Sequence, residues 1–157
     1  MSTKVLHEAI LIPAAPGNPR NSEASVVELK DGRLLLAWSR FTGGGSDWDT
    51  ADISAMVSSD GGRTWGQSFV LQENIGQMCT YSPTLLRLQS GALGFTCFVK
   101  NSISDNRVYW RKSLDEGQTW SEPLCVTPKQ VYYCLNNERT IQMRNGRIVI
   151  PVSYVPV

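Results

Sequence analysis

The apolar residues of this chain fall in short runs that are separated by turn-forming residues. Examples are residues 34–38, 93–99 and 148–152, each of which follows a turn that contains glycine. None of the runs keeps the 3.6-residue period of an amphipathic helix, and short runs bounded by Gly, Pro, Asn and Asp are typical of β-strands. The pattern therefore predicts an all-β chain.

The runs recur in a fixed order, which indicates an internal repeat. The first copy has apolar segments at 23–29, 34–38, 53–57 and 67–71, and the second at 82–88, 93–99, 108–111 and 124–127. A third copy begins with 137–143 and 148–152. Gly32, Gly91 and Gly146 occupy the same place in the three copies, 59 and 55 residues apart. Repeats of four short strands are typical of the blades of a β-propeller.

This interpretation divides the chain into about two and a half blades of four antiparallel strands. We expect one partial propeller domain over residues 1–157. Its parts are a leading strand at 4–12, a blade at 21–71, a second blade at 81–127 and a half blade at 136–155.

An eight-residue motif separates the third and fourth strands of each complete copy. Both motifs read S-x-D-x-G-x-T-W; the shared positions are Ser58, Asp60, Gly62, Thr64 and Trp65 in the first, and Ser113, Asp115, Gly117, Thr119 and Trp120 in the second. An Asp can accept hydrogen bonds from backbone N–H groups just downstream, and glycine adopts positive φ without a Cβ penalty. We expect each motif to form a tight turn, with the Trp folded back over the hairpin.

The motif resembles the Asp-box, or bacterial neuraminidase repeat, of the sialidase superfamily. The resemblance implies a six-bladed propeller, of which this chain would form a part. In that superfamily the box is a structural turn, so Asp60 and Asp115 are expected to shape the fold and not to catalyse a reaction.

Strand alternation assigns the connections to two opposite faces of the propeller. The glycine turns and both Asp-boxes lie on one face. The longer polar segments, at 20–23, 40–52, 100–107 and 136–139, lie on the other, and functional loops are often of this kind.

The resemblance also implies roles for individual residues on that second face. The family begins its first blade with Phe/Tyr-Arg-Ile-Pro, whose Arg helps to clamp the substrate carboxylate; here the matching positions are Asn21-Ser22-Glu23-Ala24, so the motif is absent. Arginine suits such a clamp because its planar fork makes bidentate bonds. The candidate substrate-binding residues are Arg20, Arg40, Arg139, Glu138 and Asp49.

Asp47 is the candidate catalytic acid/base, because the family places an Asp in the corresponding loop of its first blade. Asp49 and Asp52 are rivals. We expect burial beside Trp48 to raise the pKa of the Asp47 carboxyl so that it can protonate a leaving oxygen. The family's Tyr nucleophile comes from later blades, which these residues do not include.

The composition of the chain limits the classes of partner and cofactor that we expect it to bind. The chain carries 15 Lys+Arg and 14 Asp+Glu, which gives no support for nucleic-acid binding. No apolar run is long enough to cross a membrane, and no secretory signal peptide is recognised at the N-terminus, so the localisation is left open. The four cysteines lack metal-site spacing, and neither a metal nor another cofactor is expected.

Two questions stay open. The chain is a sialidase-like exo-glycosidase that removes a terminal acidic sugar, incomplete by itself, or a non-catalytic Asp-box module that binds a glycan or a protein, or a scaffold that binds no ligand. It is either part of a longer propeller or a subunit of a homodimer, in which the leading strand of one copy completes the unfinished blade of the other.

Overall fold

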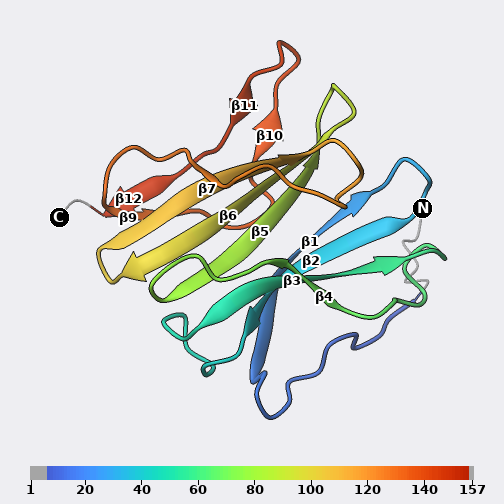
Figure 1. The fold of residues 1–157 in the computed structure, drawn as a ribbon, viewed down its shortest axis with the longest axis horizontal. Helices are drawn as coiled ribbons and strands as arrows, with labels where there is room; N and C mark the ends of the chain where they lie inside the picture. The colour runs from blue at the N-terminus through green and yellow to red at the C-terminus, as the bar shows by residue number, and fades with distance from the viewer. Residues whose placement is uncertain (1–6, 156–157) are drawn as a thin grey trace, which may run out of the picture.

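The computed structural model describes residues 7–155, which form antiparallel β-sheets and no helix. Figure 1 shows two main sheets that diverge from a common region, as neighbouring blades of an open, partial propeller do. The described part of the chain contains no helix that could cross a membrane.

The first sheet has the order β1-β2-β3-β4, with each strand antiparallel to the next. Its strands are β1 (Arg20–Glu28), β2 (Leu34–Phe41), β3 (Ala51–Ser58) and β4 (Phe69–Gln72). Arg20 pairs with Phe41, and Phe41 pairs with Ala51. The start of β1 and both ends of loop 42–50 therefore lie at the same end of the strands.

The second sheet repeats this order and then gains two strands. It is built from β5 (Cys79–Arg87), β6 (Leu93–Ser102), β7 (Asp105–Ser113) and β8 (Leu124–Cys125). β9 (Tyr132–Cys134) joins β7 through one parallel pair, Asn106 with Tyr132, and β12 (Ser153–Val155) pairs with β9. β10 (Ile141–Gln142) and β11 (Ile148–Val149) form a separate hairpin.

Three expected boundaries are wrong. Residues 7–12 of the expected leading strand form no strand, because no neighbouring strand pairs with them; residues 4–6 lie outside the described residues. The loop expected at 100–107 is a tight turn at 103–104, since β6 and β7 stay paired almost to their ends. The third copy begins at Tyr132 and not at 136, and each of its two strands is divided into two short pieces.

We call the first strand segment of each copy its inner strand. In each copy this segment passes through a residue in the left-handed region of φ. These residues are Glu23, Ser82 and Glu138, with φ of 55°, 56° and 60°. In β1 and β5 the ladder register shifts at this point, which is a β-bulge. Non-glycine residues adopt positive φ only at an energetic cost, so neighbouring contacts must hold them there.

Buried hydroxyl groups supply those contacts and tie each copy to the next. Ser39 Oγ accepts a 2.8 Å bond from the Ser82 amide, and Ser25 Oγ accepts one of 2.7 Å from the Leu85 amide. Thr84 Oγ1 accepts one of 2.9 Å from the Glu138 amide. These bonds give the three amides a hydrogen-bond partner in the neighbouring copy.

Apolar side chains fill the interface between the first and second sheets, which we call the first seam. Leu35, Ala37 and Ile53 of the first sheet pack in one cluster with Leu93 and Phe95 of the second. Tyr109 and Trp120 close this cluster from the side of β7 and the second Asp-box. Burial of this area stabilises the relative position of the two sheets.

The two Asp-boxes form the same hydrogen-bonded turn. In the first, Asp60 accepts bonds from the Thr64 amide and hydroxyl at 2.8 and 2.6 Å. The hydroxyl of Ser58 accepts a bond from the Gly62 amide at 2.9 Å, and the indole of Trp65 donates to the Gly62 carbonyl. Asp115 makes the corresponding bonds in the second box. Each set closes its turn from within.

Glu116 gives the second box a further role. It occupies the place of Gly61 in the first box, and both have positive φ, 61° and 70°. Its carboxylate accepts two bonds from Arg87 and one from the Lys30 amide, so it joins the second box to the turns of both sheets. Bonding to Arg87 lowers the pKa of Glu116 to about 2.

We predict that the Asp-boxes make stability sensitive to acid. Hydrogen bonds from Thr64 and Thr119 lower the folded-state pKa values of Asp60 and Asp115 to about 2, from an ordinary 3.8. Because the folded values lie below the unfolded ones, this stabilisation is present above about pH 4 and is lost as the pH falls toward 2. Thermal unfolding of Asp115→Asn should begin at a lower temperature than that of the parent at pH 7, and the two should converge near pH 2. An unchanged difference at both pH values would contradict this assignment.

We predict that alanine is worse than glycine at position 116. Both substitutions lose the Arg87 pair, but glycine relieves a left-handed conformation that alanine retains, a difference of about 1 kcal/mol. Urea unfolding should therefore give Glu116→Gly a larger free energy of unfolding than Glu116→Ala. Gly61→Ala is the matched control and should destabilise the first box. The opposite order of the two Glu116 variants would exclude this explanation.

Candidate functional site

The strand pairing brings the polar segments to one end of the sheets, which we call the loop face. The starts of β1, β5 and β9 lie there beside the ends of β2, β6 and β12. The Asp-boxes lie at the opposite end, where Glu116 contacts the β1–β2 turn. The loop face is therefore built by both sheets, and loop 42–50 of the first sheet reaches the second.

Arg20 and Asp47 form an ion pair on the loop face. The Arg20 guanidinium also lies 4.4 Å from the centre of the Phe41 ring and donates to the Gly45 carbonyl. The Asp47 side chain is 64% exposed, so the burial that we expected beside Trp48 is wrong. The structure presents Asp47 as a solvent-accessible carboxylate held by an arginine.

Lys100 lies directly beneath this pair and is fully buried. Its ammonium donates a 2.7 Å bond to the backbone carbonyl of Asp47. The ring centres of Trp48, Tyr81 and Tyr132 are 4.3, 4.6 and 5.5 Å from Nζ. The sequence pattern indicated a solvated loop at this position; that interpretation is wrong because β6 extends through Lys100 into the first seam.

Two neighbours of Lys100, Cys79 and Tyr81, keep their protons at neutral pH. Burial raises the pKa of the Cys79 thiol to about 11 and raises that of the Tyr81 hydroxyl well above its ordinary value. The amide nitrogen of Asn106 donates to the Tyr81 hydroxyl at 2.9 Å. Neither Cys79 nor Tyr81 is therefore a ready nucleophile in this conformation.

Two of the other candidates are occupied by contacts within the first sheet. Arg40 makes a bidentate pair with Asp52, and this bonding raises the pKa of Arg40. Asp49 accepts a 2.7 Å bond from the Ser46 amide and closes a turn inside loop 42–50. Both residues shape the loop that carries Asp47.

Arg139 and Glu138 lie on the third copy, apart from the Arg20–Asp47 pair. Both side chains are exposed, and Arg139 borders a shallow pocket with Cys134 and Pro151. Within residues 7–155, Arg139 makes no ion pair.

Glu23 is a further acidic residue of the inner strands that the motif comparison did not single out. Its carboxylate accepts a 2.7 Å bond from Ser39, and the neighbouring Ala24 carbonyl accepts one from Asn137. This second bond places the first and third inner strands side by side. The sequence could have indicated that Glu23 and Glu138 occupy corresponding places, because each precedes the glycine turn of its copy by a similar interval.

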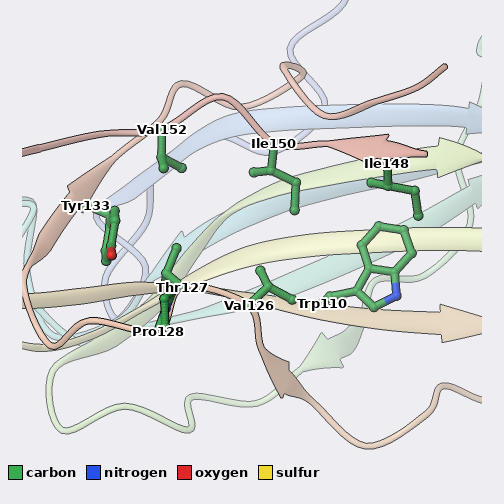
Figure 2. Close-up of a pocket in the computed structure, with 8 residues that line it drawn as sticks. All are labelled: Trp110, Val126, Thr127, Pro128, Tyr133, Ile148, Ile150 and Val152. Carbon is green, nitrogen blue, oxygen red and sulfur yellow. The ribbon is translucent and has the colours of Figure 1, made fainter.

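A cavity lies away from these groups, between the second sheet and the third copy. Its volume is about 530 Å3, and Figure 2 shows Trp110, Val126 and Pro128 on one side with Ile148, Ile150 and Val152 opposite. Counted from the glycine turns, Ile148 and Ile150 take the places of Leu93 and Phe95, which in the first seam pack with Tyr109 and Trp120.

Three solved structures share this fold at low sequence identity. A Hadza microbial sialidase matches with a TM-score of 0.72 over 88% of this chain, at 17% identity. The sialidase NanB from Streptococcus pneumoniae matches with a TM-score of 0.66 over 94%, at 8% identity. An alpha-L-arabinanase from Penicillium chrysogenum matches with a TM-score of 0.56 over 71%, at 20% identity.

This chain has the fold of the sialidase-type β-propellers. The expected all-β propeller architecture is thus confirmed. The chain spans 33%, 43% and 34% of the lengths of those three proteins, respectively. No family model matches the sequence, and no curated protein does.

Among the described residues, no group of three or more His, Cys, Asp or Glu side chains could hold a metal ion. The loop face presents an arginine, a carboxylate and the partly exposed Trp48 above a buried lysine. Such groups suit recognition of a sugar that carries an acidic group.

Proposed function

We propose that the loop face binds the terminal acidic sugar of a glycan, and that the propeller to which it belongs is a sialidase-like exo-glycosidase. The observation that carries the proposal is the Arg20–Asp47 pair, which places a cation and an accessible carboxylate side by side next to the exposed ring of Trp48. The sialidase fold of the neighbours supports the same class of reaction.

In this proposal the substrate carboxylate competes with Asp47 for Arg20. A planar guanidinium binds a carboxylate through two parallel hydrogen bonds, so the sugar's acidic group can take the place of Asp47. The released Asp47 carboxylate then takes up a proton from solvent and donates it to the glycosidic oxygen, as the bond from that oxygen to the anomeric carbon breaks and an incoming nucleophile bonds to that carbon. The nucleophile is not assigned to a residue of this chain.

The second candidate is a module that binds glycan or protein without hydrolysis. It is favoured by the pairing of Asp47 with Arg20 and of Arg40 with Asp52, which occupies these charges within the protein. The raised pKa values of Cys79 and Tyr81 also leave the face without an activated nucleophile. The two candidates share the binding face and differ in turnover.

Asp47→Asn separates the two candidates. If Asp47 is the general acid, hydrolysis of a sialoside should fall by about 100-fold or more. Binding of the same sialoside, measured by calorimetry, should stay equal or become tighter, because the neutral amide of the variant no longer offsets the charge of Arg20. Asp31→Asn, on the Asp-box face, is the matched control and should change neither quantity. Normal turnover in the Asp47 variant would exclude Asp47 as the acid, and absence of turnover in the parent would favour the binding module.

We also propose a homodimer in which residues 7–12 of each copy cover the apolar cavity at the third copy of its partner. Residues 7–12 form no strand and Ile10 is 87% exposed, while the cavity at the third copy is lined by apolar side chains. Light scattering should give about twice the 17.4 kDa chain mass, and Ile10→Asp should shift the protein to the monomer. Ile103→Asp, at an exposed turn, is the control. A parent that stays monomeric at all concentrations would contradict the dimer.

A further inference from the structure

Lys100 places a charged side chain at a buried position. The residue has no exposed surface, and among residues 7–155 it makes no ion pair. A buried ammonium is costly unless its surroundings compensate the charge. Here the compensation comes from the Asp47 carbonyl oxygen and from the faces of three aromatic rings, which attract a cation.

The same contacts account for most of what joins loop 42–50 to the second sheet. The loop's own bonds, such as Thr42 to Thr50 and Ser46 to Asp49, are internal to the first sheet. Across the seam, the Asp47 carbonyl accepts from Lys100 at 2.7 Å and weakly from Cys79 at 3.8 Å, and the Trp48 ring lies against Tyr132. Lys100 is the strongest of these links because its bond is charge-assisted.

We propose that Lys100 is a positioning residue that holds loop 42–50 on the second sheet and thereby fixes Asp47 and Trp48 over the binding site. Its ammonium clamps the loop at the Asp47 carbonyl, so the Asp47 carboxylate points to Arg20 from a defined backbone position. It also supports one face of Trp48, whose ring remains 43% exposed. The exposed part of that ring forms a subsite for the apolar face of a sugar ring.

This inference extends the proposed glycan-binding function, because the subsite is meaningful only if a sugar occupies the loop face. The clamp itself is a property of the free protein and can be measured without a ligand. Its failure can therefore be distinguished from failure of the glycan proposal.

The test compares Lys100→Met with Lys112→Met, which removes an exposed lysine from the same sheet. Lys100→Met keeps a side chain of similar length, so the chain should retain its circular dichroism spectrum. Amide hydrogen exchange at residues 46–49 should become about tenfold faster or more, because a charge-assisted bond and desolvated cation–π contacts are lost. Tryptophan fluorescence should shift as Trp48 loses its support, and Lys112→Met should show neither change.

Trp48→Leu tests the clamp from the other side, at a partly exposed position where folding is not at risk. It should also speed exchange at residues 46–49 and should weaken binding of sialyllactose several-fold, while Lys100→Arg should restore much of the protection lost in Lys100→Met. Unchanged loop exchange in both Lys100→Met and Trp48→Leu would overturn the proposal. If sialyllactose does not bind the parent while the exchange results hold, the clamp stands and the sugar subsite is overturned.

Discussion

The arrangement of this molecule depends on a few buried hydrogen bonds between hydroxyl groups and the backbone of the next repeat. At each inner strand the chain passes through a left-handed residue. Ser25, Ser39 and Thr84 accept bonds from amides of the following repeat, which gives those amides a partner outside their own sheet. A buried amide without a partner costs more than such a bond contributes, so these hydroxyl groups specify the position of the neighbouring repeat.

The two faces of the propeller are held in order by different kinds of contact. On one face the Asp-boxes close their turns within the same repeat, and Glu116 joins them to Arg87 and Lys30. The opposite face has no repeated motif of this kind. Its order comes from contacts across the first seam, among which Lys100 beneath Asp47 is central. One face is thus locally stable, and the other is free to vary its loops for binding.

The strands and the Asp-boxes could be predicted because their causes are local. Alternation of apolar runs with glycine turns predicts strands, and the spacing of Asp60, Gly62 and Thr64 predicts a closed turn. The leading strand could not be judged in this way, since an extended segment becomes a strand only when a partner strand accepts its bonds.

The site residues were harder to predict because their roles depend on the packing of one sheet on another. Asp47 and Arg20 were recognised as candidates, but their mutual ion pair depends on the path of loop 42–50 and has no local signal. Lys100 looks like an ordinary loop lysine until β6 is seen to continue into the seam between three aromatic rings. Long-range packing decides the environment of such a residue, and no sequence motif predicts that environment.

The central claim is that the loop face, and not the Asp-box face, binds an acidic sugar. The most direct measurement is a titration of the isotope-labelled protein with sialyllactose, followed residue by residue through the backbone amide signals in NMR spectra. If the loop face binds the sugar, saturable shifts should appear at residues 20–23, 42–50 and 100–106, with the Asp-box residues 58–65 and 113–120 unchanged. Shifts centred on the Asp-boxes, or no saturable shift at any residue, would contradict it.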